Sequence, residues 1–407
     1  MNTMNLVAGL DIGNGYVKGA INLRENLKNK PQSIDFPSGV ARIIYPKDIK
    51  TEVSEAGYVI DDIFNQMDVS FGSNLVKDTT RRLFGARGLA SGSTLEEFDV
   101  DSVQSKAQQD LSGILVLGCI AGQALKEYWD KTGELPKETI PVHTRVALAL
   151  PINEFMHYRK QYAANFKNGS HMVTFYNFTV PVNVEIVFDD VQVLAEGASA
   201  QYAINAKGKP LMDAMLADVR RLGESLDGIT ADDILAATNT VGIDIGEGTV
   251  NFPVFQNGKF NSDASLTFDR GYSSVLNNAL EVLGPIFMFK NRKQLADFLQ
   301  KQPNAITRNK WNKCWEEVNK QAYSFSMEIS EYFSRVMRRV GASTEVIYIY
   351  GGGASALKET LHPLILKEVK GFGGEGMSYP VLYLDSRYSR HLNREGLYIV
   401  AEKLAER

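Results

Sequence analysis

Two segments of the chain repeat one arrangement, an aspartate followed by a Gly-x-Gly turn. The first is GLDIGNGYVK, from Gly9 to Lys18, and the second is GIDIGEGTVN, from Gly242 to Asn251. In each segment a short apolar stretch contains an aspartate, Asp11 or Asp244, and the glycines let the turn bring backbone N–H groups close to an anion. One copy alone would fit an ordinary hairpin. Two matched copies indicate an internal duplication and predict a site that holds a polyphosphate from two sides.

The charged residues of the two segments have different expected roles. Carboxylates repel phosphate, so we expect Asp11 and Asp244 to hold Mg²⁺, through its water shell. Lys18 occurs only in the first segment, and we expect its ammonium group to offset phosphate charge. The five histidines show no metal-ligand spacing, and we expect structural or surface roles for them.

A third glycine-rich turn follows both segments. The apolar stretch 346–350 is typical of a buried strand, and it leads directly into Gly351, Gly352, Gly353 and Ala354, where a helix is expected to begin. Such a turn lets a flat ring or a phosphate approach the backbone, and the helix N-terminus favours negative charge. Strand-to-helix glycine turns are common in α/β folds, so this one is informative because of its position after both hairpins.

The order of these turns resembles that of the actin, heat-shock chaperone and sugar kinase superfamily. With the ending LNREGLY, residues 392–398, the chain looks most like the ParM-type actin-like proteins that segregate plasmids. The resemblance implies an α/β fold of two ribonuclease-H-like (actin-fold) domains flanking a nucleotide cleft, each with an inserted subdomain. It also implies Mg²⁺ and ATP (or GTP) as ligands. Carried over by position, the nucleotide contacts are Asp11, Gly13, Asn14, Gly15, Tyr16 and Lys18, then Gly246, Glu247, Gly248 and Thr249, and finally Gly351, Gly352, Gly353 and Ala354.

The resemblance further implies a carboxylate that orients the attacking water, located before the second hairpin. Glu196 follows a strand-like stretch and precedes a helix-like one, so we expect Glu196 and Asp244 to be the catalytic residues. The alternative for Glu196 is an ordinary carboxylate at a helix start, stabilised by the helix dipole. Asn251 departs from the pattern, because many relatives have a second aspartate there. The charged stretch 207–238 lengthens the gap before the second hairpin, and we interpret it as an insertion.

Strand-like and helix-like stretches alternate in two sets, which predicts two α/β domains. The first would span residues 1–205, with a polar, irregular inserted subdomain at about 23–110 and a C-terminal helix, 388–407, that packs back on it. The second would span residues 206–387, with an inserted subdomain at about 285–320. A length of 407 residues fits two cores better than one.

The densest basic cluster of the first half comprises Lys77, Arg81, Arg82 and Arg87, partly within the stretch 74–84, whose pattern predicts a short helix. We interpret the cluster as a solvated helix face, with a lateral filament contact or a DNA-adaptor contact as the alternative. The formal net charge of −4 gives no general attraction to nucleic acid or to an anionic membrane, so we expect no direct binding to either. Two unpatterned cysteines and the lack of a signal sequence or long apolar run predict a cytoplasmic protein.

The expected activity is hydrolysis of the γ-phosphate of ATP (or GTP). By the resemblance, nucleotide binding would favour head-to-tail filaments, because a heterologous contact that does not close generates an open helix. An adaptor protein that binds DNA would then connect the filament to a plasmid. The alternatives are a small-molecule kinase, a chaperone-like ATPase and a non-polymerising nucleotide-gated scaffold on the same fold.

Overall fold

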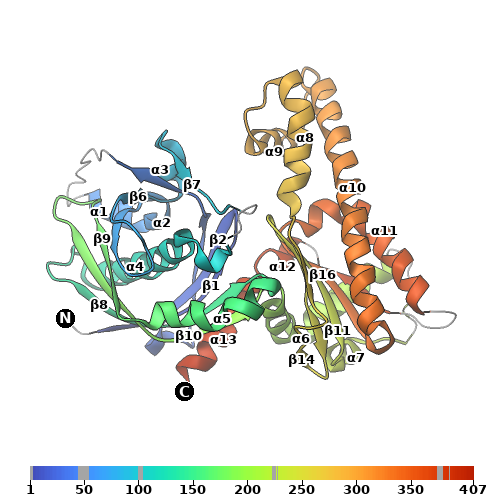
Figure 1. Cartoon of the computed structure of the whole chain (residues 1–407), viewed down its shortest axis with the longest axis horizontal. Coiled ribbons are helices and arrows are strands. Elements are labelled where there is room, and N and C mark those ends of the chain that lie inside the picture. Colours follow the sequence, from blue (N-terminus) through green and yellow to red (C-terminus); the bar gives the residue numbers. More distant parts are fainter. Residues whose placement is uncertain are drawn as a thin grey trace. The chain divides into compact units, whose positions relative to one another are not determined.

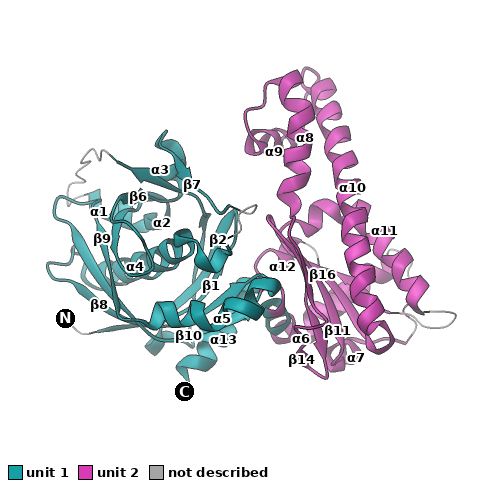
Figure 2. Ribbon diagram, in the orientation of Figure 1, with its two compact units in different colours: residues 1–195, 199–203, 393–407 teal, residues 196–198, 204–392 magenta. Residues whose placement is uncertain are grey.

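The computed structural model divides into two compact units (Figure 2). Unit 1 comprises residues 1–195, 199–203 and 393–407, and unit 2 comprises residues 196–198 and 204–392. The structure describes residues 3–44, 55–99, 104–221, 226, 228–373, 379–384 and 386–407. Residues 388–392, which the sequence analysis placed with the first domain, belong to unit 2.

Unit 1 is built on one ten-stranded sheet (Figure 1). In spatial order its strands are β3 (Gln32–Pro37), β2 (Tyr16–Leu23), β1 (Met4–Ile12), β8 (Ile140–Leu150), β10 (Val182–Ala195), β9 (Ser170–Phe175), β5 (Asp68–Gly72), β6 (Arg81–Leu83), β4 (Val40–Ile43) and β7 (Leu95–Glu96). The strands β1, β8 and β10 run parallel, whereas β1 and β2 form an antiparallel hairpin.

Successive residues of a strand point to opposite faces of the sheet. The central strands of unit 1 therefore pack against helices on both faces. On one face, Leu6, Ala8 and Leu10 of β1 join the core that contains α4 (Asp110–Thr132) and residues of α5 (Ile152–Lys167). On the other face, Val7 packs with Leu397 and its neighbours in α13 (Leu392–Ala405). The C-terminal helix therefore holds the strand that leads into the first hairpin.

Residues 23–110 are more regular than the sequence analysis expected. The strands β4 to β7 lie in this range and extend the sheet beyond β9, together with α1 (Ala56–Asp61), α2 (Ile63–Gln66) and α3 (Gly85–Ala90). Each of these strands has at most five residues. Such short strands show too few alternations for a period of two to be recognised in the sequence.

Unit 2 has a seven-stranded sheet in which β11 is central. Its strands are β11 (Thr240–Ile245), β12 (Val250–Phe252), β13 (Val254–Gln256), β14 (Lys259–Phe260), β15 (Leu266–Phe268), β16 (Val346–Tyr350) and β17 (Val381–Tyr383). The parallel pairs β11–β16 and β16–β17 place the carboxyl ends of β11 and β16 at one edge. That edge carries the second hairpin and the turn after β16.

The helices of unit 2 pack beside this sheet and extend past it. They are part of α6 (Ala198–Arg221, which breaks at Gly208), α7 (Ala231–Ala236), α8 (Tyr272–Phe287), α9 (Arg292–Gln300), α10 (Arg308–Val340), α11 (Ala354–Gly373) and α12 (Ser386–Ser389). Figure 1 shows α8, α9 and the first half of α10 projecting as an arm beyond the sheet of unit 2. No helix in the described residues is long and apolar enough to cross a membrane.

Candidate nucleotide site

The first hairpin joins β1 to β2 through the turn Gly13–Asn14–Gly15. The N–H of Gly13 donates to the carbonyl of Tyr16 at 3.0 Å, which closes the turn. Asp11, Gly13, Asn14, Gly15 and Lys18 are all half-buried, so the turn remains open to a ligand. Tyr16 is 41% exposed. The structure thus brings together all of the predicted first-hairpin residues.

Ser38, which no sequence pattern singled out, fixes this turn. Its hydroxyl donates to the carbonyl of Gly13 at 2.5 Å, and its N–H donates to the carbonyl of Gly15 at 3.0 Å. Ser38 is fully buried and directly follows β3, which pairs with β2. Both turn carbonyls therefore accept hydrogen bonds from Ser38, so their oxygens are satisfied within the fold and the turn N–H groups are left as the donors to an anion. The Pro37-Ser38-Gly39 sequence is a turn signal but gave no indication of its partner.

Lys18 lies between two aspartates in the sheet. The β1–β2 register pairs it with Asp11, and the β2–β3 register pairs it with Asp35. Directly paired residues of neighbouring strands project from the same face of a sheet. The row Asp11–Lys18–Asp35 therefore surrounds one ammonium group with two carboxylates on the hairpin's own face.

The second hairpin joins β11 to β12 and is held by a helix. The N–H of Gly246 donates to the carbonyl of Thr249 at 2.9 Å, as in the first copy. At the start of α8, the N–H groups of Tyr272 and Ser273 donate to the carbonyls of Gly246 and Glu247, each at 3.0 Å. A Cβ atom on Gly271 would collide with the Glu247 carbonyl, so only glycine allows this approach.

Glu196 contacts the second hairpin through a polar network. The Asn251 amide donates to the Glu196 carboxylate at 3.2 Å, and the Thr249 hydroxyl lies 3.5 Å from the same oxygen. The Thr267 hydroxyl donates to the Asn251 amide oxygen at 2.8 Å, which sets the direction of the amide. Glu196 is half-buried and Asn251 is 2% exposed. An amide at position 251 can donate to Glu196, whereas an ionised aspartate there would repel it.

Asp244 lies beside this network at the end of β11 and is only 4% exposed. The Tyr350 hydroxyl donates to the carbonyl of Gly197 at 2.8 Å, which anchors the residue next to Glu196. Burial, together with the negative charge of Asp244, holds the pKa of Tyr350 well above its usual value. Tyr350 therefore remains a neutral donor.

The turn Gly351–Ala354 lies against the second hairpin. The N–H of Gly353 donates to the carbonyl of Ile245 at 2.9 Å. Gly351 has φ of +104°, and a Cβ there would lie 2.6 Å from the Asp244 carboxylate. Around Gly352, by contrast, an added Cβ would meet no atom within 4 Å. The turn is thus packed on one side and open on the other, as a ligand contact requires.

Glu247 is paired with an arginine of the arm. The Arg292 guanidinium lies 3.0 Å from the Glu247 carboxylate, and both side chains are more than one-third exposed. Arg292 is the first residue of α9, so α9 and the N-terminus of α8 both contact the second hairpin. Arg292 was not singled out in the sequence, because it lies far along the chain from the hairpin.

The carboxylates fit Mg²⁺ bound together with phosphates. Mg²⁺ usually keeps several waters and is held by one or two carboxylates plus substrate phosphates, rather than by a cage of side chains. Within the described part of the chain, no three His, Cys, Asp or Glu side chains gather as a metal-binding group. Asp11 at the first hairpin and Asp244 at the second each have the chemistry to hold such an ion through its water shell, and the ion would supply charge neutralisation to the phosphates.

The basic cluster near residue 80 is not a solvated helix face. Arg81 and Arg82 lie in β6, and Arg82 is 1% exposed. Arg82 pairs with Glu96 and Asp78, whereas Arg81 and Arg87 both pair with Asp68. Of the four cluster residues only Lys77 is largely exposed. Buried arginines need fixed carboxylate partners, so these charges stabilise the fold instead of offering a docking surface.

Two family models match successive parts of the chain. The model "Actin like proteins N terminal domain" matches residues 9–198, and the model "Archaeal actin homologue MreB-like, C-terminal" matches residues 242–363. Each match includes one of the two hairpins. The chain belongs to the actin-like superfamily.

Solved structures of actin-like proteins share the fold along the whole chain. Alp7A matches with a TM-score of 0.63 and 15% identity, covering 99% of this chain and 97% of that one. A 15-stranded ParM filament from Clostridium botulinum matches with 0.58 and 15%, covering 99% and 100%. The psk41 ParM protein matches with 0.55 and 18%, covering all of both chains. No curated protein matches at a significant level. At these identities the likeness shows a ParM-like actin fold.

Proposed function

We propose that this actin-like protein is a Mg²⁺-dependent ATPase (or GTPase). The observation that carries the proposal is the cluster in unit 2, where Asn251 and Thr249 hold the Glu196 carboxylate beside the phosphate-binding turn that Asp244 precedes. A carboxylate fixed next to a Gly-x-Gly turn can orient a water molecule for in-line attack on a γ-phosphate. The matching Asp–Gly-x-Gly turn of the first hairpin supports the same ligand class.

Different groups of the chain would bind the phosphates, orient the attacking water and contact the nucleoside. Backbone N–H groups of the two turns donate to phosphate oxygens, and Lys18 offsets phosphate charge. Glu196 accepts a hydrogen bond from the attacking water and aligns it with the phosphorus atom. Gly351–Ala354 supplies backbone contacts to the purine and ribose. Mg²⁺, when held by Asp11 and Asp244 through its own water shell, would neutralise charge on the phosphates.

Phosphate release tests the assignment. We expect Glu196→Gln to lower kcat about 100-fold or more, since an amide is a poor acceptor for the water proton, with little change in nucleotide affinity. Asp244→Ala should also bind nucleotide and hydrolyse it slowly. Glu185→Gln, on the same strand as Ala195 but away from the hairpin, is the matched control. Turnover of Glu196→Gln at the wild-type rate would refute the role of Glu196.

We further propose that nucleotide binding drives self-assembly into filaments, and that a DNA-binding adaptor connects these to plasmid DNA in the cytoplasm. The support is the shared fold with ParM proteins, one of which is described as a filament. Light scattering and sedimentation with and without Mg-ATP test assembly, with phosphate release followed in parallel. Absence of assembly with every nucleotide, together with phosphate transfer to a metabolite, would indicate a kinase of the same fold.

A further inference from the structure

The repeat that forms the second hairpin contains no cation of its own. Residues 242–251 include two carboxylates, Asp244 and Glu247, and neither lysine nor arginine. The first repeat, by contrast, ends with Lys18, which the β1–β2 register places opposite Asp11. A polyphosphate at the second turn would therefore meet only repelling charges from that segment, unless a cation reaches the turn from elsewhere in the chain.

Arg292, the first residue of α9, brings a cation to the second turn. Its guanidinium lies 3.0 Å from the carboxylate of Glu247, which stands between the two glycines of the turn. The carboxylate is therefore within one side chain's length of the turn N–H groups that the proposed function assigns to phosphate. The side chains of Arg292 and Glu247 are 39% and 36% exposed, so salt can screen the charge of the pair.

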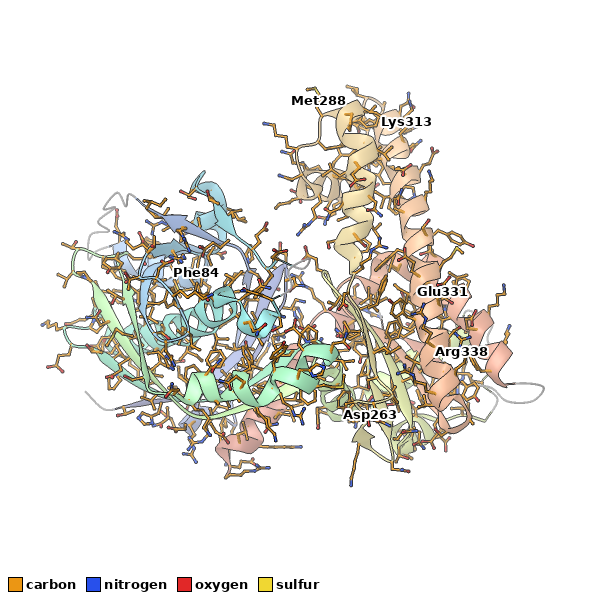
Figure 3. The ribbon with its side chains drawn as sticks, in the orientation of Figure 1. Phe84, Asp263, Met288, Lys313, Glu331 and Arg338 are labelled. Carbon is orange, nitrogen blue, oxygen red and sulfur yellow. The ribbon has the colours of Figure 1, made fainter. Side chains whose placement is uncertain are left out.

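The chain leaves the second hairpin along α8 and returns to it through Arg292. The N–H groups at the start of α8 donate to the carbonyls of Gly246 and Glu247. The 16 residues of α8 span about 24 Å, and Met288, which caps the helix, lies at the far end of the arm (Figure 3). α9 begins soon after this point, and the long side chain of Arg292 carries a charge back to the turn.

Contacts other than the Arg292 pair hold α9 in place. The Asn291 side chain caps its N-terminus. Leu295 is fully buried in the core of unit 2, and the indole N–H of Trp311 donates to the carbonyl of Leu299 at 3.2 Å. An ion pair as exposed as this one adds little to stability. Its main effect is therefore on the charge of the turn, and the fold of α9 does not depend on it.

We propose that the arm contributes to nucleotide binding through Arg292, which cancels the charge of Glu247 so that the second turn can accept a polyphosphate. This rests on the nucleotide binding proposed above. Without the guanidinium, an uncompensated carboxylate would lie beside the bound phosphates and repel them. Each hairpin then has one cation. Lys18 comes from the first repeat itself, whereas the second repeat receives Arg292 from an inserted helix.

Removal of the arginine charge is the first test. Arg292→Gln should raise the dissociation constant for Mg-ATP about tenfold, measured by titration of a fluorescent ATP analogue, with the melting temperature unchanged. Arg292→Lys keeps the charge and should retain most of the affinity. Lys293→Gln removes the same charge from the next residue of α9, which pairs with Asp297 instead of the turn, and is the matched control. A loss of affinity in Lys293→Gln equal to that in Arg292→Gln would contradict the proposal.

Glu247→Gln distinguishes charge cancellation from anchoring of α9. If the pair only anchors α9, this variant breaks the same anchor and should weaken binding as Arg292→Gln does. Under the proposal, Glu247→Gln removes the repelling carboxylate and keeps the backbone N–H, so the affinity for Mg-ATP should rise. Combined with Arg292→Gln, it should restore most of the lost affinity. A double variant that binds as weakly as Arg292→Gln alone would overturn the proposal.

The dependence on salt is an independent test. Because the pair is partly exposed, higher ionic strength should reduce the difference in affinity between Arg292→Gln and the wild type, and a difference that does not change with salt would contradict an electrostatic role. Equal affinities of the wild type and Arg292→Gln would overturn this inference and leave nucleotide binding by the hairpins intact. A wild-type chain that binds neither ATP nor GTP would overturn the proposed function as well.

Discussion

The two hairpins share a sequence, yet different neighbours hold them. In the first, Ser38 donates to both turn carbonyls, one through its hydroxyl and one through its N–H, whereas in the second the N–H groups at the start of α8 donate to them. Gly9 and Gly242, the first residues of the two repeats, also lie against different neighbours. A Cβ on Gly9 would collide with the backbone of Tyr398 in α13, and a Cβ on Gly242 would lie 2.6 Å from the Tyr350 hydroxyl. One motif is thus compatible with two structural surroundings.

The residue opposite the motif aspartate decides the chemistry of each copy. The strand register pairs Asp11 with Lys18 and Asp244 with Asn251, so lysine and asparagine occupy equivalent positions. The lysine places a positive charge at the first hairpin. The asparagine instead donates to Glu196, which places a carboxylate beside the second hairpin, where the proposed function needs one to orient water. Under the proposed function, charge binding and hydrolysis would thus be divided between the two copies by the residue at this single position.

The largest expected effect is on nucleotide affinity, when Lys18 of the first hairpin is replaced by asparagine, the residue at the equivalent position of the second. Lys18→Asn removes the ammonium group that offsets phosphate charge, so nucleotide affinity should fall about 10- to 100-fold, as for loss of a charged hydrogen bond. Titration of a fluorescent nucleotide measures the change. Lys28→Asn, at an exposed position after β2, is the control. Unchanged affinity would show that the Lys18 ammonium group offsets only the charges of Asp11 and Asp35, not those of the nucleotide.

Asn251→Asp should lower kcat about tenfold at alkaline pH, because an ionised carboxylate about 3 Å from Glu196 repels it. Two carboxylates at this distance favour sharing one proton, and a protonated aspartate can again donate to Glu196. The ratio of variant to wild-type kcat should therefore rise as pH falls. Asn251→Ala, which cannot donate at any pH, should show a constant ratio. Parallel pH profiles for both variants would exclude positioning of Glu196 by Asn251.

Ser38→Ala should lower the free energy of unfolding by about 1–2 kcal/mol, because the Gly13 carbonyl loses the donor hydroxyl of the buried Ser38. Urea denaturation measures the change. Nucleotide affinity should fall as well, since the turn is less ordered. The corresponding change in the second hairpin would alter backbone groups of α8, so it has no equally simple variant. Wild-type stability in Ser38→Ala would mean that the Ser38 N–H alone holds the turn.

Tyr350→Phe should have the smallest effect, a loss of about 1 kcal/mol in the free energy of unfolding, because one buried hydrogen bond to Gly197 disappears while the ring is retained. Tyr383→Phe, which removes a hydroxyl that donates to Ala354, provides a matched comparison in the same unit. If Tyr350 helps to position Glu196, only Tyr350→Phe should also lower kcat. Equal kcat values would limit Tyr350 to a structural role.

The sequence by itself predicted the superfamily, both hairpins and the third glycine turn. These features are local, since the ten residues of an apolar strand and its Gly-x-Gly turn are enough to predict the conformation of the turn. Glu196 was also predicted, but only through the resemblance. The pairing of Glu196 with Asn251 could not be read from the sequence, because it depends on the register of β11 and β12 and on where β10 ends.

Other features were decided by the tertiary structure alone. Arg82 looked like a surface charge but is buried, with Asp78, four residues before it, and Glu96 of β7 as its ion-pair partners. No sequence pattern pointed to Ser38, and it contacts the first turn only because β3 pairs with β2. Local sequence determines turns and strands, whereas the partner of a polar side chain depends on which distant segments the fold places beside it.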